Sequence, residues 1–223
     1  MNKIIFSENA AMLTISAFHY VPPFAQGVVR DLRVRWALEE AGLLYETRLI
    51  GPADQRSPDY LALQPFGQVP MMQDGDLTLF ESGAIVLHIA QRSGALMPRE
   101  EAGRARVAAW MFAALNTVEV PIQQLAAIDL FFADEEWARL RRAGAVEEVH
   151  LRLRQLAAWL GERAYLDGAF SAGDLMMTTV LRILRHTTMV DEYPTLKAYQ
   201  LRCEARPAFQ KALRDQMAAF EKA

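Results

Sequence analysis

Hydrophobic residues follow two different periods in the two parts of this 223-residue chain. Up to about residue 95, short apolar or alternating runs separate longer helical patterns, which predicts strands and helices in turn. From residue 104 onward, apolar residues recur at spacings of three and four, and almost no strand pattern remains. The chain is therefore expected to be α/β plus all-α, with an α/β domain over 12–95, a linker over 96–103 and an all-helical bundle over 104–223.

The first part predicts a small mixed four-stranded sheet. Its first two strands flank a helix, and such a unit pairs its strands in parallel through a crossover. Its last two strands flank Asp74-Gly75-Asp76, where Asp-Gly marks a tight antiparallel hairpin. Ser82 is expected to cap the helix that follows, and residues 52–58 are expected to be loop. The expected strands are 12–18, 45–49, 69–73 and 77–80, and the expected helices are 28–41 and 82–93.

The second part predicts helices alone, over about 104–117, 146–160, from 171, 195–205 and from 207. Pro121 is expected to break or kink the first of these runs. Ser171 and Asp174 have the spacing of a capping box, with Phe170 and Leu175 as its apolar staple. We interpret this box as structural, because it satisfies the free amides at the start of a buried helix.

Charge and cysteine content exclude several classes of protein. The net charge is −3 over residues 1–95 and zero over the rest, unlike the basic body of a nucleic-acid-binding protein. No apolar run is long enough for a membrane-spanning helix, and the first eleven residues lack the pattern of a signal peptide. The single cysteine, Cys203, excludes an internal disulfide and a multi-thiolate metal site, and it suits the reducing cytoplasm. His150 and His186 lack metal-ligand spacing, so no metal is expected.

Two segments carry candidate binding chemistry. In Pro65-Phe66-Gly67-Gln68-Val69-Pro70, a proline opens a predicted strand. If the Val69–Pro70 bond is cis, the turn presents the amide and carbonyl of Val69 to a ligand backbone. The alternative is an ordinary trans proline at the start of a strand.

The second segment is Phe80-Glu81-Ser82, at a predicted strand-to-helix turn. A helix N-terminus attracts a ligand carboxylate, and Glu81 can pair with a ligand ammonium. The alternative is a capping Ser82 beside a solvated Glu81. Taken together, the two segments suit a small peptide with a free amino-acid end.

Residues 65–82, PFGQVPMMQDGDLTLFES, resemble the glutathione-binding half of the cytosolic glutathione S-transferase family. The resemblance extends over about residues 12–220 and implies a thioredoxin-like N-terminal domain, an all-helical C-terminal domain and a homodimer. It implies that Val69 pairs through its backbone with the cysteinyl part of glutathione, next to a cis Pro70. It also implies that Glu81 and Ser82 hold the γ-glutamyl head, with Gln68 nearby.

The family places a Tyr, Ser or Cys opposite the glutathione sulfur, and this chain departs from that pattern. The corresponding stretch reads Gly27-Val28-Val29-Arg30, so the resemblance implies an atypical member, expected to be bacterial. The guanidinium of Arg30 is one candidate to favour the thiolate. The hydroxyl of Tyr20 is a second candidate, and His19 is a weaker one.

The resemblance implies conjugation of glutathione, the co-substrate, to a small hydrophobic electrophile. Met111, Phe112 and Leu115 are candidates to line the cleft for that second substrate, although such stripes more often belong to a core. One alternative function is a non-catalytic glutathione-binding or protein-interaction module. Another is glutathione-dependent reduction of peroxides or disulfides. Neither nucleic acid nor membrane is expected as a partner.

Overall fold

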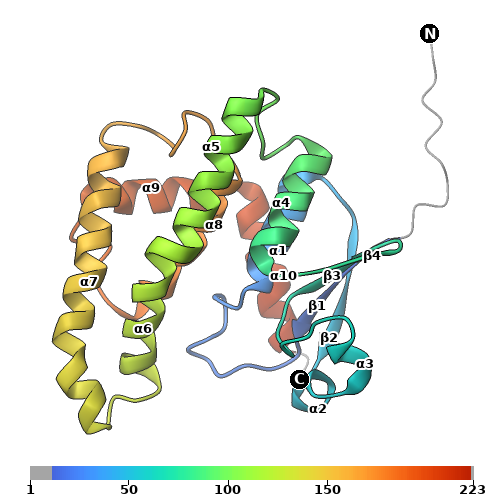
Figure 1. Cartoon of the computed structure of the whole chain (residues 1–223), viewed down its shortest axis with the longest axis horizontal. Coiled ribbons are helices and arrows are strands. Elements are labelled where there is room, and N and C mark those ends of the chain that lie inside the picture. Colours follow the sequence, from blue (N-terminus) through green and yellow to red (C-terminus); the bar gives the residue numbers. More distant parts are fainter. Residues whose placement is uncertain (1–11, 222–223) are drawn as a thin grey trace.

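The computed structural model describes residues 12–221 and shows a mixed four-stranded sheet beside a set of long helices (Figure 1). The strand order is β2-β1-β3-β4. β1 (Leu13–Phe18) pairs in parallel with β2 (Tyr45–Ile50) and antiparallel with β3 (Met71–Asp74). β3 continues through a hairpin into antiparallel β4 (Leu77–Phe80). The predicted thioredoxin-like N-terminal domain is confirmed.

Four helices belong to the sheet-containing part: α1 (Asp31–Ala41), α2 (Pro52–Gln55), α3 (Pro58–Leu61) and α4 (Ser82–Ser93). α1 begins three residues later than expected. The chain before it is held in turns, with Gly27 at φ 78° and the Val28 amide donating to the Ala25 carbonyl at 3.2 Å. α2 occupies the segment expected to be loop, because Pro52 suits the first helical position.

The helical part contains α5 (Glu101–Phe112), η1 (Ala113–Val118), α6 (Glu119–Leu130), α7 (Glu136–Leu160), α8 (Ala172–Leu181), η2 (Arg182–His186), α9 (Pro194–Glu204) and α10 (Pro207–Phe220). Of the two expected effects of Pro121, a break does not occur, since α5, η1 and α6 follow one another without interruption. The helix is instead distorted before the proline. η1 is a π-helical turn just before the proline. Pro121 lacks the amide hydrogen that a regular helix uses to bond to Thr117, and the wider turn accommodates this missing bond.

The predicted capping box at α8 is confirmed. The Ser171 hydroxyl accepts from the Gly173 amide at 3.2 Å, and the Asp174 carboxylate accepts from the Ser171 amide at 3.0 Å. Asp174 also accepts from the Leu166 amide at 2.9 Å and the Tyr199 hydroxyl at 3.0 Å. Each group is buried, so these bonds fix the helix start within the bundle.

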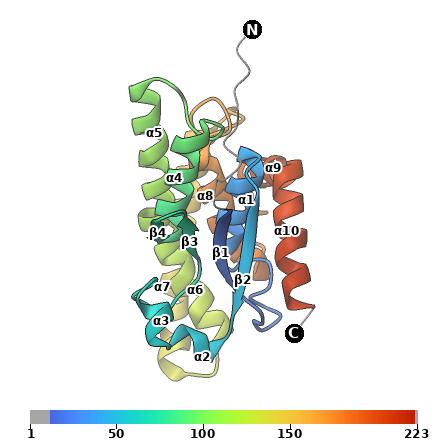
Figure 2. The same cartoon turned by 90° about the vertical axis from the view of Figure 1, so that its right-hand side faces the viewer.

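Helix α1 lies between the sheet and the bundle, and Figures 1 and 2 show it flanked by α4, α8 and α10. Trp36 on α1 is fully buried, with its ring centroid 4.8 Å from that of Phe209 and 5.6 Å from that of Phe170. Arg206 forms an ion pair with Glu40 on α1 at 2.6 Å. One hydrophobic core therefore runs through both parts and fixes the cleft between them.

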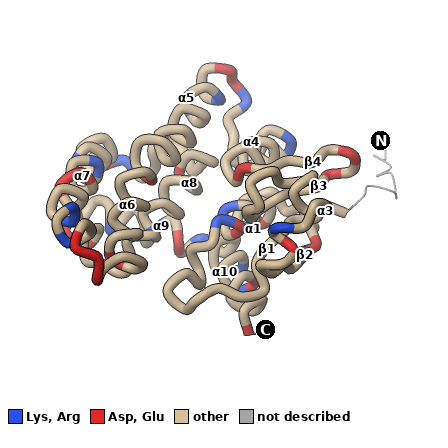
Figure 3. The backbone as a smooth tube through the Cα atoms, turned by 60° about the horizontal axis from the view of Figure 1, so that its bottom comes forward, with Lys and Arg blue, Asp and Glu red and all other residues tan. Residues whose placement is uncertain are grey.

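Charged residues of both signs are distributed along the chain, as Figure 3 shows. No helix within residues 12–221 combines the length and the apolar character needed to cross a membrane. The same residues contain no group of three His, Cys, Asp or Glu side chains arranged to hold a metal ion.

Candidate functional site

The Val69–Pro70 peptide bond is cis. The segment around it is held from both sides, because the Tyr60 hydroxyl donates to the Gln68 carbonyl at 2.6 Å and the Met71 amide donates to the Ser16 hydroxyl at 2.8 Å. Within residues 12–221, the amide and carbonyl of Val69 itself have no hydrogen-bond partner. β3 begins at Met71 rather than at Val69, so this backbone edge is left available to a ligand.

Glu81 joins β4 to α4 in an unusual backbone conformation, with φ 68° and ψ 115°. Glu81 is the N-cap of α4 and Ser82 is the first helical residue, so the expectation that Ser82 caps the helix is wrong. The Glu81 side chain is exposed, whereas Ser82 is buried. A non-glycine residue in such a conformation costs about 1–3 kcal/mol and occurs mostly at functional sites.

The hairpin brings the two segments together. Met71 on β3 lies opposite Phe80 on β4, so Val69–Pro70 and Glu81–Ser82 extend from the same end of one antiparallel pair. A cavity of about 490 Å³ adjoins the second segment and is lined by Arg30, Arg33, Glu81, Ser82, Leu115, Asn116, Glu119, Val120, Gln123 and Gln124. Tyr20 lies in the loop after β1 and is 60% exposed.

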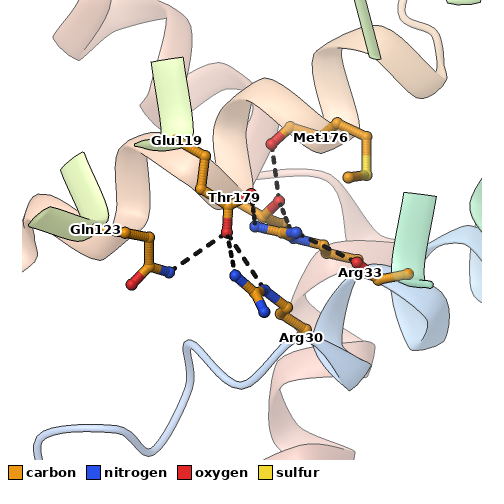
Figure 4. A network of polar contacts seen from close by, with 7 residues as sticks. Arg30, Arg33, Glu119, Gln123, Met176 and Thr179 are labelled. Carbon is orange, nitrogen blue, oxygen red and sulfur yellow. Dashed lines mark hydrogen bonds and ion pairs between the residues drawn. The ribbon is translucent and has the colours of Figure 1, made fainter. Parts of the chain in front are cut away.

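A buried ion-pair network connects this cavity to the bundle (Figure 4). Arg33 on α1 donates from Nη1 to the Ser82 hydroxyl at 3.2 Å and from Nε to the Thr179 hydroxyl at 3.2 Å. Its Nη2 pairs with Glu119 Oε2 at 3.0 Å. Arg30 Nη2 pairs with Glu119 Oε1, also at 3.0 Å. One carboxylate from the bundle therefore holds two arginines of the α/β domain.

Burial and charge set the ionisation of this network. Burial alone raises the pKa of Glu119, but the guanidinium groups of Arg33 and Arg30 outweigh it and hold that pKa below its ordinary value. Burial lowers the pKa of Arg33, and the charge of Glu119 partly offsets this effect. Each buried charge thus depends on the other for its ionised form.

Sequence reasoning missed Arg33, Glu119 and Gln123. Arg33 and Glu119 are 86 positions apart, and charged residues on helices are usually solvated, so no local pattern marks this pair. Arg30, a candidate from the sequence, lies at the N-terminus of α1 and lines the cavity beside Ser82.

Met111, Phe112 and Leu115 line an apolar pocket of about 320 Å³ between α4 and α5, together with Glu81 and Gly83. A second apolar pocket, of about 440 Å³, lies between the loop before α1 and the bundle. It is lined by Pro23, Phe24, Ala25, Val28, Gln123, Ala126, Leu130, Phe131, Ile183, Arg185 and His186. Because Gln123 also lines the cavity beside Ser82, the second pocket adjoins that cavity.

Comparisons with known proteins agree with this geometry. The family description "Glutathione S-transferase, N-terminal domain" matches residues 25–91, which include both candidate segments. Glutathione S-transferase 1 of Zea mays is 35% identical over 200 residues, covering 80% of this chain and 88% of that protein. This chain belongs to the glutathione S-transferase family. Glutathione S-transferase 4 of Zea mays is 33% identical over 194 residues, covering 80% and 85%.

Solved glutathione transferases share the whole architecture. The theta class enzyme from Xanthomonas axonopodis pv. citri, solved with glutathione bound, has a TM-score of 0.77 and 30% identity, covering 90% of this chain and 96% of that one. Glutathione transferase F7 from Populus trichocarpa has a TM-score of 0.77 and 27% identity, covering 92% and 99%. The thioredoxin-like domain followed by a helical domain is thus the glutathione S-transferase fold.

Proposed function

We propose that this glutathione S-transferase binds glutathione across the end of the β3–β4 hairpin and conjugates it to a small hydrophobic electrophile. The observation that carries the proposal is the pairing of Met71 with Phe80, which sets the open edge of Val69 beside Glu81 and Ser82. An extended tripeptide needs such an edge for its backbone and an ion-pairing turn for its amino-acid head. Residues 12–95 supply this binding surface, and the helical part that begins at residue 104 supplies the opposite wall.

The cysteinyl part of glutathione pairs with the amide and carbonyl of Val69, next to Pro70. Glu81 receives the ammonium of the γ-glutamyl head, with Gln68 close by, and Ser82 receives its carboxylate. Because the Ser82 oxygen accepts a hydrogen bond from Arg33, its own hydrogen remains available to that carboxylate.

The sulfur comes from the ligand, because the only cysteine of the chain is buried in the bundle. The thiol releases its proton to water, and Arg30 stabilises the thiolate by charge. The sulfur then forms a bond to an electrophilic carbon, and the leaving group departs with its electron pair. Tyr20 is the second candidate to face the sulfur, as a hydroxyl donor.

We propose that the electrophile occupies the apolar pocket beside Val28, because this pocket adjoins both the start of α1 and the cavity of Arg30 and Ser82. The pocket of Met111, Phe112 and Leu115 is proposed instead to lie at a subunit contact of a homodimer. We propose that Phe66, which is 67% exposed and has its ring 6.0 Å from that of Phe80, belongs to the same subunit contact. A cytoplasmic location and a bacterial source belong to the same proposal.

Calorimetric titration with glutathione and turnover of a chloronitrobenzene electrophile test the proposal, with Glu81→Ala as the variant. We expect wild-type binding and turnover, and a loss of glutathione affinity of at least tenfold in the variant, which corresponds to one charge-assisted hydrogen bond of about 1.5–3 kcal/mol. Normal glutathione saturation of Glu81→Ala contradicts the assigned site. Binding without turnover of electrophiles or peroxides favours the non-catalytic module instead.

A further inference from the structure

We propose that Glu119 and Gln123 are positioning residues that set the ionisation of the bound glutathione thiol, through the way they hold Arg30. This inference rests on the proposed function, in which Arg30 stabilises the thiolate. The inference adds that residues of the bundle, and not only those of the thioredoxin-like domain, determine the net charge beside the glutathione sulfur.

Glu119 is the centre of the network in Figure 4. Its Oε1 accepts from Arg30 Nε at 3.3 Å, from Arg30 Nη2 at 3.0 Å and from Gln123 Nε2 at 3.3 Å. Its Oε2 faces Arg33 Nη2 at 3.0 Å. The side-chain amide of Gln123 therefore shares one oxygen with Arg30 and limits where the guanidinium can lie.

The charges of the network do not cancel. Two guanidinium groups face one carboxylate, which leaves one positive charge in excess. Arg33 is 3% exposed, and its Nε, Nη1 and Nη2 are each used. The Arg30 side chain is 44% exposed, and its Nη1 has no hydrogen-bond partner within residues 12–221. The excess charge is therefore accessible to a ligand at Arg30 alone.

Other charged groups face this region and form the background to any titration. Glu81 lies before α4, and Arg33 belongs to the same helix as Arg30. Arg182 and Arg185 on η2 donate to the loop before α1, at the carbonyls of Gly27 and Phe24. These groups are unchanged when only α6 is altered. Their effect on the pKa of the bound thiol is therefore the same in every variant of α6.

Helix α6 offers a matched pair of positions. Gln123 and Gln124 are adjacent, both are exposed and both line the cavity. Gln123 lies one turn after Glu119 and bonds to it, whereas Gln124 has no hydrogen bond to the network within the described chain. Gln123→Glu and Gln124→Glu thus add the same charge at neighbouring places, but only the first sets a second carboxylate beside Arg30.

The experiment measures the pKa of bound glutathione from thiolate absorbance against pH, together with the pH profile of kcat/KM. We expect Gln123→Glu to raise the pKa of the bound thiol by about one unit, because the new carboxylate neutralises Arg30. Gln124→Glu should raise it by less than half as much. When Arg30 is also replaced by Gln, Gln123→Glu should raise the pKa of the bound thiol no more than Gln124→Glu does.

Equal shifts in the two glutamate variants overturn the inference, and so does a Gln123→Glu shift that persists without Arg30. The comparison of the single variants is decisive even if Arg30→Gln binds glutathione poorly. Failure of the wild-type protein to bind glutathione in calorimetry refutes the proposed function itself. Wild-type binding and turnover with no difference between the two variants refute only the role of Glu119 and Gln123.

Discussion

The hydroxyl groups of Ser16 and Tyr60 lie 2.8 Å apart, at the centre of a relay that holds both ends of the Val69–Pro70 segment. The Met71 amide donates to Ser16, and Tyr60 donates to the Gln68 carbonyl. Because the Tyr60 hydrogen is used in that bond, Ser16 must donate to Tyr60. The relay thus has one direction, and every hydroxyl in it is satisfied.

Removing one hydroxyl from this relay should weaken both the fold and the site. We expect Tyr60→Phe to lower the free energy of unfolding by about 1–3 kcal/mol, because it leaves buried polar groups unpaired. Urea denaturation measures this loss, and calorimetry should show weaker glutathione binding. Ser16→Ala breaks the same relay. The double variant should therefore lose less unfolding free energy than the sum of the losses in the two single variants. Losses that add within about 0.5 kcal/mol contradict the relay.

Glu81 should show a conflict between stability and binding. Its positive φ suits glycine, so Glu81→Gly should be more stable than Glu81→Ala by about 1–2 kcal/mol. Both variants lose the carboxylate, and both should lose glutathione affinity equally. Thermal denaturation and calorimetry separate the two effects. Equal stability of the glycine and alanine variants would show that the backbone at this position is relaxed.

Glu119 should stabilise the protein in a pH-dependent way. Its pKa in the folded protein lies below the ordinary value of 4.5, so its contribution is complete above about pH 4.5 and is lost as the pH falls through the folded value. At neutral pH, Glu119→Gln leaves the buried Arg33 without its charge partner and should cost about 3–5 kcal/mol.

The measurement is urea denaturation of the wild type and of Glu119→Gln between neutral pH and about pH 3. The difference in unfolding free energy should shrink as the pH falls below about 4.5, because the unfolded wild type then binds a proton at Glu119 more readily than the folded protein does. A difference that stays constant with pH would mean that the carboxylate charge is not what stabilises the network. Arg30→Gln is the comparison, and it should cost less than about 1 kcal/mol because Arg30 is exposed.

Cys203 should be unreactive in the folded protein. Burial raises the pKa of its thiol to about 12, so the thiolate is rare at neutral pH. We expect a maleimide to leave the native protein unmodified and to add once per chain after denaturation, as counted by mass spectrometry. Cys203→Ala should retain conjugation, since glutathione supplies the sulfur. Rapid labelling of the native state would contradict the buried position.

Local signals predicted most of the fold. The Asp74-Gly75 hairpin and the Ser171–Asp174 box each involve residues close in sequence, and the structure confirms both. The nearness of the Val69 and Glu81 segments also followed from a local cause, because a tight hairpin fixes which residues face each other.

What the sequence did not predict depends on distant contacts or on unusual backbone. The pairing of Arg33 with Glu119 arises only when α1 packs against the bundle, so neither residue differs in sequence from a solvated helix charge. The shift of the N-cap from Ser82 to Glu81 depends on a positive φ at a residue that rarely adopts it. The Ser16–Tyr60 contact joins residues 44 positions apart.

The π-helical turn at 113–118 also determines which side chains of α6 face α1. Each residue of a regular helix advances the direction of the side chain by about 100°, so one extra residue in a turn rotates everything downstream by that amount. Deleting a single residue there would leave one continuous α-helix, but it would rotate the Glu119 side chain away from Arg33. Short insertions and deletions at this point are thus a route by which relatives could acquire different chemistry opposite the same thioredoxin-like surface.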